Sequence, residues 1–184
     1  LLKHEHNDHV VELDDVRPFN FMYGQSMPIF ATKRVQQSLR ERYSYAFAKN
    51  PYPGAPSYTL ETIQAQRRFQ CNHWEVTPIE VQHGKMPVLG FRFGDFTYIT
   101  DAKTILPREK EKIQGTRLLI LNALHHNEHY SHMNLEQALA LVKEIQPEKA
   151  WFIHISHRMG LHEKMEAQLP NHVSLAYDGL KIQL

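Results

Sequence analysis

Residues 4–9, HEHNDH, place three histidines and two carboxylates within six residues. Neutral imidazole and carboxylate are the side chains that bind Zn²⁺, Mn²⁺ or Fe in proteins. His4 and His6 are two residues apart, so on an extended chain they point to the same side. Asp8 and His9 need a turn before they can reach a second ion. A segment this short supplies only part of a metal site, and the rest must come from elsewhere in the chain.

Further ligand-type residues end or interrupt apolar segments that we expect to be strands. His83 follows PIEVQ, Asp101 follows FTYIT, and His154 lies in AWFIHIS. If these strands share a sheet, the three side chains can converge at one edge. Seven ligand-type residues in four separated segments are more than one ion needs. Two divalent ions about 3.5–4 Å apart clamp a phosphoryl group and activate a bridging water.

The elements that must position these residues alternate between strand and helix patterns. Turn signals at Gly94-Asp95 and Asp178-Gly179 predict two tight connections, the second joining a pair of strands at the end of the chain. The pattern indicates the α/β (α+β) class with a mixed sheet, in one domain over residues 1–184. Strands are expected at 75–82, 87–93, 96–100, 117–123 and 150–156, helices at 35–43, 135–145 and 161–169, and a long loop at 44–59.

The composition excludes several classes of protein. The chain has 184 residues, 42% of them apolar, and a net charge of +1, which indicate a globular domain with no electrostatic signal for nucleic acid. One cysteine, Cys71, allows no internal disulfide, and it is interpreted as a plain buried thiol. No segment resembles a signal peptide or a membrane span, so a cytoplasmic protein without a membrane partner is predicted. Histidine is the exception, because ten of the thirteen fall within 4–9, 125–132 and 154–162.

Together these segments resemble the metallo-β-lactamase fold. HEHNDH matches its HxHxDH motif, and QHGKMPVLGFRF, YITDAK and FIHISHR are similar, in the right order, to later motifs of its phosphodiesterase branch. That branch contains ribonuclease Z and the phosphoribosyl 1,2-cyclic phosphate phosphodiesterases. The resemblance covers nearly the whole chain and implies an αββα sandwich. The family normally has about 60 further residues before this motif, so we expect that N-terminal strands are missing and that LL at the start is the end of a strand.

The resemblance also implies roles for individual residues. Two divalent ions, Zn²⁺ or Mn²⁺, are the expected cofactors. The segment HHNEHYSHMN, 125–134, offers the histidine that the family places before a helix, and His132 fits best, with His129 as the alternative. It would stabilise the oxyanion or protonate the leaving oxygen, so Asp8 and His132 are the candidate catalytic residues. The implied ligands are His4, His6 and His83 for one ion, Asp8, His9 and His154 for the other, and Asp101 bridging both.

The sequence leaves two interpretations for several other residues. His157 competes with His154 for the last ligand position, and the latter is preferred. The aspartates and arginine of LDDVRPFN, residues 13–20, are either structural or support a ligand histidine. The aromatic residues of 44–59 either stack on a substrate or pack as a lid.

The expected function is hydrolysis of a small cyclic phosphate or nucleotide-like phosphodiester by a metal-bound hydroxide. An RNA 3′-processing endonuclease of the ribonuclease Z type is the second reading, weakened because no Gly/Pro-rich arm for tRNA is visible. Lactam or thioester hydrolysis is third. A non-catalytic metal-binding scaffold, and a homodimer that completes the site, stay open. Expected partners are therefore a small phosphodiester substrate, RNA in the second reading, and a second copy of the chain in the last.

Overall fold

The computed structural model describes residues 1–183 and divides into two compact units, Leu1–Gln64 and the remainder from Ala65 onward. Each unit has its own sheet and its own cluster of buried apolar side chains. Among the described residues no helix is long and apolar enough to cross a membrane.

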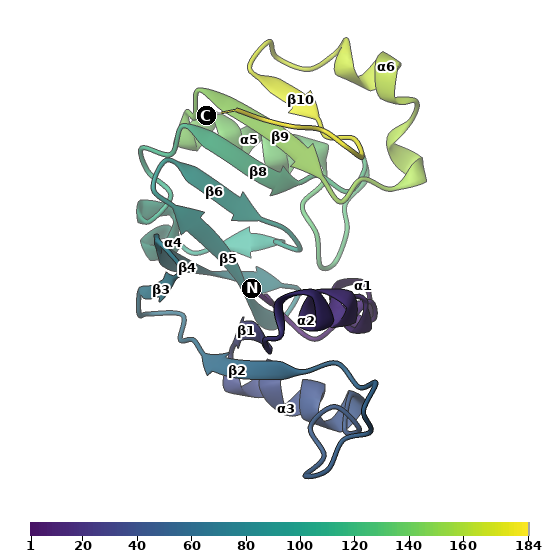
Figure 1. The fold of residues 1–184 in the computed structure, drawn as a ribbon. Coiled ribbons are helices and arrows are strands. Elements are labelled where there is room, and N and C mark those ends of the chain that lie inside the picture. The colour runs from purple at the N-terminus through teal and green to yellow at the C-terminus, as the bar shows by residue number, and fades with distance from the viewer. Residues whose placement is uncertain (184) are drawn as a thin grey trace. The chain divides into compact units, whose positions relative to one another are not determined.

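The first unit begins with short helices and ends with a small sheet (Figure 1). Strands β1 (Met27–Ala31) and β2 (Tyr58–Thr62) pair in parallel, and helix α3 (Lys33–Arg42) connects them in part. Val35 and Leu39 of α3 join Val10, Ile29 and others in the core of this unit. Before the sheet lie α1 (Asn7–Val10), the 3-10 helix η1 (Leu13–Val16) and α2 (Arg17–Tyr23).

The second unit is built on an eight-stranded mixed sheet with the order β10-β9-β8-β6-β5-β4-β3, and β7 pairs with β4. Neighbouring strands from β3 to β6 are antiparallel, and those from β6 through β8 and β9 to β10 are parallel. The strands are β3 (Phe69–Cys71), β4 (Trp74–His83), β5 (Met86–Phe93), β6 (Phe96–Ile99), β7 (Thr104–Ile105), β8 (Leu118–Asn122), β9 (Lys149–Ile153) and β10 (Val173–Leu175). The helices are α4 (Pro107–Glu111), α5 (Leu135–Ile145), the 3-10 helix η2 (His157–Met159) and α6 (His162–Glu166).

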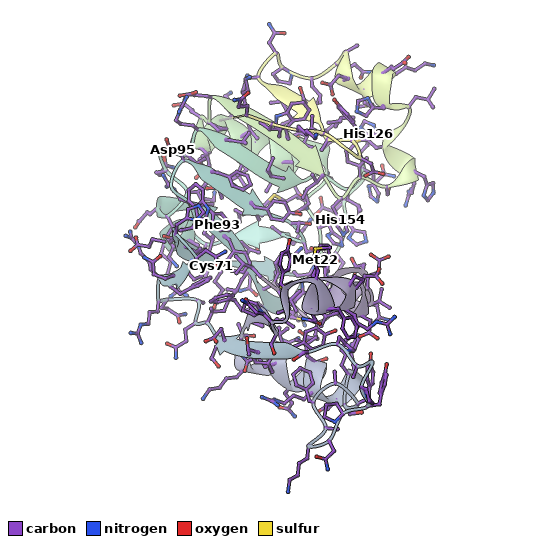
Figure 2. All side chains as sticks on the ribbon, in the orientation of Figure 1. Met22, Cys71, Phe93, Asp95, His126 and His154 are labelled. Carbon is purple, nitrogen blue, oxygen red and sulfur yellow. The ribbon has the colours of Figure 1, made fainter. Side chains whose placement is uncertain are left out.

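Local sequence explains the clearest elements. β8 is buried at all five positions, as its continuous apolar run requires in a parallel sheet. α5 begins with a capping box between Asn134 and Gln137, and its apolar face enters the core. Gly94 and Asp95 form the turn between Phe93 of β5 and Phe96 of β6 (Figure 2), and Gly94 takes the positive φ of 55° that a tight hairpin needs.

Most expected elements of the second unit are confirmed, and the corrections concern the two ends of the chain and the loop before β2. The second of the two closing strands is wrong, because 176–183 contain a turn at Tyr177–Leu180 and no strand. The first residues are not in a strand either, although Leu2 N–H donates to Phe30 O at 2.9 Å. The loop predicted for 44–59 ends at Ser57, since β2 begins at Tyr58. The predicted mixed α/β class is confirmed.

Candidate metal centre

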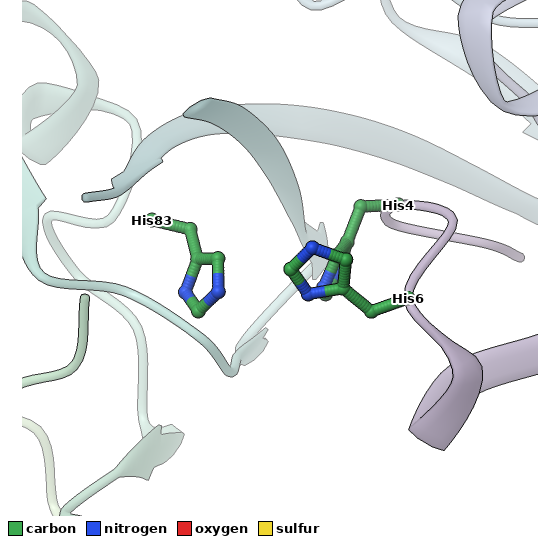
Figure 3. A group of neighbouring side chains, drawn as sticks. All are labelled: His4, His6 and His83. Carbon is green, nitrogen blue, oxygen red and sulfur yellow. The ribbon is translucent and has the colours of Figure 1, made fainter. Parts of the chain in front are cut away.

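The histidines of the HEHNDH segment form one cluster inside the first unit. The ring centroids of His4 and His6 are 4.6 Å apart (Figure 3), and those of His4 and His9 are 4.5 Å apart. Asp8 Oδ2 lies 3.1 Å from His9 Nε2. The turn that Asp8 and His9 need is present, because His6 has extended angles (φ −64°, ψ 151°) and α1 starts at Asn7. The four ligand-type residues of this segment therefore gather at one point of their unit.

Asp14 connects the region after α1 to the second half of the first unit. The Tyr45 hydroxyl donates to Asp14 Oδ2, and Tyr58 donates to Asp14 Oδ1 at 3.2 Å and to Leu13 O at 3.1 Å. Burial, followed by Asp14, raises the pKa of Tyr58, and the same causes raise the pKa of Tyr45. These contacts support the structural reading of Asp14. The side chain of Arg17 donates to Gly54 O at 3.4 Å, another contact within the unit.

The second unit brings its ligand-type residues together from the ends of three strands of its sheet, β4, β6 and β9. His83 is the last residue of β4, Asp101 comes two residues after β6, and His154 directly follows β9. The possible ligand atoms of His83, Asp101 and His132 all lie within 4.8 Å of one another. His154 Nε2 is 3.1 Å from Asp101 Oδ1, and the His154 ring stacks on His132 with centroids 4.7 Å apart. The convergence expected for the strand-end residues is therefore present within this unit.

Two of these residues hold strained backbone conformations. Asp101 has a φ of 62° and His154 a φ of 56°, both in the left-handed region. For a residue other than glycine this conformation costs about 1–3 kcal/mol and persists only where the surroundings enforce it. Asn72, in the turn after β3, and Gln146, at the end of α5, also have positive φ. Such strain concentrates at functional sites, and the other two residues that carry it are the expected bridging aspartate and the last ligand histidine.

Asn122, the last residue of β8, enforces the turn at Asp101. Its Oδ1 accepts from Ala102 N–H at 2.7 Å and its Nδ2 donates to Ala102 O at 3.0 Å. Both groups are completely buried. Thr100 Oγ1 also donates to Asp101 Oδ2 at 3.1 Å. The amide side chain thus continues the sheet pairing beyond the end of β6 and fixes the residue that follows Asp101. Sequence reasoning missed Asn122, and the only local sign was a polar residue at the end of an apolar strand.

The tautomer of His83 follows from its neighbours. Its Nδ1 is 3.1 Å from Asp101 O and 3.1 Å from Ser131 O, two groups that only accept hydrogen bonds. Nδ1 must therefore carry the proton, and Nε2 carries the lone pair. A ligand histidine characteristically donates its other N–H to a carbonyl in this way. This donor set fits a divalent metal.

His132 is buried beside the strand-end residues. Its Nδ1 is 3.8 Å from Asp101 Oδ1, beyond hydrogen-bond range, and has no hydrogen-bond partner within residues 1–183. Burial, then His154 and His83, lowers the pKa of His132 to about 4. The ring is therefore neutral near pH 7. His129 packs on it with centroids 5.0 Å apart, and burial lowers the pKa of His129 as well.

The segment that carries His132 is held at both ends. Met133 N–H donates to Ala102 O at 2.8 Å, and Leu135 N–H donates to His125 O at 2.9 Å. Within the segment, Glu128 contacts the ammonium of Lys103, which also donates to Gln137 Oε1 in α5 at 3.1 Å. The Asp101 turn and the His132 segment thus share the backbone of Ala102 and the side chain of Lys103.

The structure also bears on the hypotheses for His157, Cys71 and the 44–59 loop. His157 is exposed in η2, so His154 and not His157 pairs with Asp101. Cys71 is half-buried at the end of β3, an outer strand (Figure 2), which corrects the expectation of a buried thiol. In the 44–59 loop Tyr45 and Tyr52 stack with centroids 6.4 Å apart, and Tyr52 is exposed.

Comparison with known proteins is consistent with this geometry. The family model of the β-lactamase superfamily domain matches residues 1–155. A crystal structure of a diphosphatase from the PhnP family superposes with a TM-score of 0.88 at 30% identity, covering 99% of this chain and 69% of that one. The short form of human tRNase Z gives a TM-score of 0.71 at 15% identity, over 99% of this chain and 77% of that chain, which supports the fold alone.

A curated relative comes from Porphyromonas gingivalis and is named octanoyltransferase. It is 38% identical over 182 residues, which are 98% of this chain. The match spans only 37% of the relative's length.

Proposed function

Because this chain belongs to the β-lactamase superfamily, we propose that it is a metal-dependent hydrolase acting on a small phosphodiester, such as a cyclic phosphate or a nucleotide-like ester. The expected metallo-β-lactamase fold of the ribonuclease Z and PhnP-like branch is confirmed. The observation that carries the proposal is the strained, buried Asp101. Its carboxylate lies against His154, and the possible ligand atoms of Asp101, His83 and His132 are all within 4.8 Å of one another.

We propose the ligand set that the family resemblance implies. His4, His6 and His83 would hold one divalent ion, and Asp8, His9 and His154 the other, with Asp101 shared. Two ions of this kind supply an activated water and neutralise charge on the phosphoryl oxygens. The Nε2 lone pair of His83 supports this assignment, since a ligand imidazole must offer a free lone pair to the ion.

His132 is proposed to act on the substrate rather than to hold an ion. Its neutral ring can donate one N–H to a phosphoryl oxygen as negative charge develops there. Asp8, as a ligand beside the attacking water, would orient that water toward phosphorus. Packing of His129 against the His132 ring limits the directions in which the ring can turn.

The substrate class is supported by one relative in particular. The PhnP-family protein that matches at 30% identity is a diphosphatase. A diphosphatase hydrolyses a phosphoanhydride, so this relative supports a small phosphoryl compound as substrate. We propose small phosphodiesters as the first substrates to test and RNA 3′ ends as the second. Cytoplasmic location and a homodimer remain predictions.

Metal analysis with a matched activity assay tests the proposal. The chain is loaded with Zn²⁺ or Mn²⁺, desalted and analysed for metal, then assayed with bis(p-nitrophenyl) phosphate and with a cyclic nucleotide. About two ions per chain and hydrolysis of at least one ester are expected. Bound metal without hydrolysis of any ester would refute the enzymatic proposal and favour a scaffold. Absence of bound metal would refute the metal centre itself.

A second candidate function rests on the relative from P. gingivalis. Its name, octanoyltransferase, suggests an octanoyl thioester as an alternative substrate. Since the match spans 37% of that protein, the transferase activity can equally reside in the part outside the match. Parallel assays with an octanoyl thioester and a phosphodiester separate the two candidates, because only one should be cleaved in a metal-dependent manner.

A further inference from the structure

The polar residues that alternate with the ligand histidines each contact an arginine of α3. Glu5 lies between His4 and His6, and its Oε1 accepts from Arg34 Nε at 2.9 Å and from Arg34 Nη2. Asn7 lies between His6 and Asp8, and its Oδ1 accepts from Arg42 Nη1. Every residue from 4 to 9 is therefore either a proposed ligand or the partner of one of these two arginines.

We propose that Arg34 and Arg42 are positioning residues that fix the direction of the ligand side chains in residues 4–9. The inference rests on the proposed metal centre. Side chains on an extended segment alternate between two faces, so Glu5 faces away from His4 and His6. A contact that fixes Glu5 on one face also fixes the direction of both imidazoles on the other. The contact at Asn7 does the same at the start of α1, where Asp8 and His9 follow.

Helix α3, which carries both arginines, is capped at its start and anchored in the core of the first unit. Thr32 caps its first turn by accepting from Val35 N–H at 3.4 Å. Val35 and Leu39 are 2% and 0% exposed and anchor the helix in the core of the first unit. A third contact follows the helix directly, because the Tyr43 hydroxyl donates to Val10 O at the end of α1. Residues 5, 7 and 10 are thus all tied to one helix, which Val35 and Leu39 anchor in the core, and to the residue after it.

The solvent exposure of the Arg34–Glu5 ion pair favours a positioning role over a stabilising one. The Arg34 side chain is 52% exposed and that of Glu5 is 18% exposed. Ion pairs this open to solvent add little to the stability of a fold. Removal of a group that orients a metal ligand, in contrast, typically changes metal affinity by about 10–100-fold. We expect a change of this size here, with the orientation passing through Glu5 and Asn7. A positioning role therefore predicts weakened metal binding with almost unchanged thermal stability.

Metal titration of arginine variants tests the proposal. Zn²⁺ affinity is measured by competition with a chromogenic chelator for wild type, Arg34→Met, Arg42→Met and the control Arg40→Met. Arg40 lies on the same helix, but its guanidinium is over the Phe47 ring, 5.1 Å from the centroid. The first two variants are expected to bind Zn²⁺ about 10–100-fold more weakly. The control should stay within about twofold, and all should melt within about 4 °C of wild type.

A charge exchange adds a rescue that a general loss of structure cannot mimic. The double variant Glu5→Arg with Arg34→Glu restores the pair in reverse and should recover most of the affinity lost in Arg34→Met. Arg34→Lys keeps the charge but loses the two-nitrogen contact, so it should also bind Zn²⁺ more weakly. It replaces Arg34→Met if that variant does not fold.

The outcomes separate this inference from the proposed function. Wild-type affinity in Arg34→Met, or in Arg34→Lys when it stands in, overturns the positioning role and leaves the proposed metal centre intact. Equal weakening in Arg40→Met also overturns it, because the effect would then come from net charge. If the wild-type chain binds no Zn²⁺, the metal centre and the positioning role are both overturned.

Discussion

Replacement of Asn122 by leucine is the sharpest test of how the Asp101 turn is held. Leucine has nearly the same volume, so the variant removes two hydrogen bonds without opening a large cavity. Ala102 O keeps its bond from Met133 N–H at 2.8 Å, but Ala102 N–H loses its partner, Asn122 Oδ1. A buried donor left without a partner costs about 1–3 kcal/mol. The free energy of unfolding should fall by that amount, because the site is completely buried.

The effect on metal binding should exceed what lost stability explains. Without Asn122, the strained φ of 62° at Asp101 can relax, and the carboxylate then leaves its place beside His154. We expect the affinity for Zn²⁺ to fall by about 10–100-fold, as for other residues that orient a ligand.

A matched core variant separates the two effects. Leu141→Ala, in the same core on α5, should cost about 2–5 kcal/mol and leave metal affinity nearly unchanged. Urea unfolding and chelator competition on both variants give the comparison. The reasoning fails if Asn122→Leu binds Zn²⁺ as tightly as wild type, or if Leu141→Ala weakens binding equally.

Three further variants or titrations test other parts of the site. Asp101→Ala should reduce bound metal from about two ions per chain to one or none and abolish hydrolysis, which metal analysis and an ester assay check together. His132→Ala should keep its metal and lower turnover by about 10²–10³-fold, and a wild-type rate on an activated phosphodiester would refute the role given to this ring. Tyr45 and Tyr58 should ionise later than an ordinary tyrosine, since burial and Asp14 raise both pKa values. Their contribution to stability is therefore fully present below about pH 10 and is lost as the pH rises further, so phenolate absorbance in Asp14→Asn should appear at lower pH than in wild type.

Elements with strong local signals were predictable from the sequence. The helix at 135–145 was predicted with the bounds observed for α5, because its sequence is amphipathic and Pro147 follows its end; the capping box of Asn134 and Gln137 is a further local signal that the structure shows. The hairpin at Gly94 and the buried strand β8 carry equally local patterns. The spacing of HEHNDH likewise predicted a turn before Asp8, and α1 provides it.

Other elements gave no local signal. Helix α2 has no buried residue, so it shows no apolar period to read. The contacts that orient the site join distant residues. Asn122 binds Ala102 across 20 positions, and Lys103 reaches Glu128 across 25. Pairing at such separations depends on the order of the strands in the sheet, and no spacing within one segment encodes it.

The ligand-type residues and the residues that orient them obey different physical rules. A divalent ion requires imidazole and carboxylate, so ligands can be recognised by residue type wherever they cluster. An orienting residue needs only a donor or an acceptor at the right place, and asparagine, lysine, arginine and tyrosine all serve here. In the second unit Asn122 holds the turn at Asp101, and both Asp101 and His154 have conformations that cost free energy in the absence of metal. That arrangement favours a site that is formed before the ion binds, because the fold holds Asp101 and His154 in these strained conformations without an ion. Metal affinity in this protein should therefore be governed as much by Asn122, Arg34 and Arg42 as by the ligands themselves.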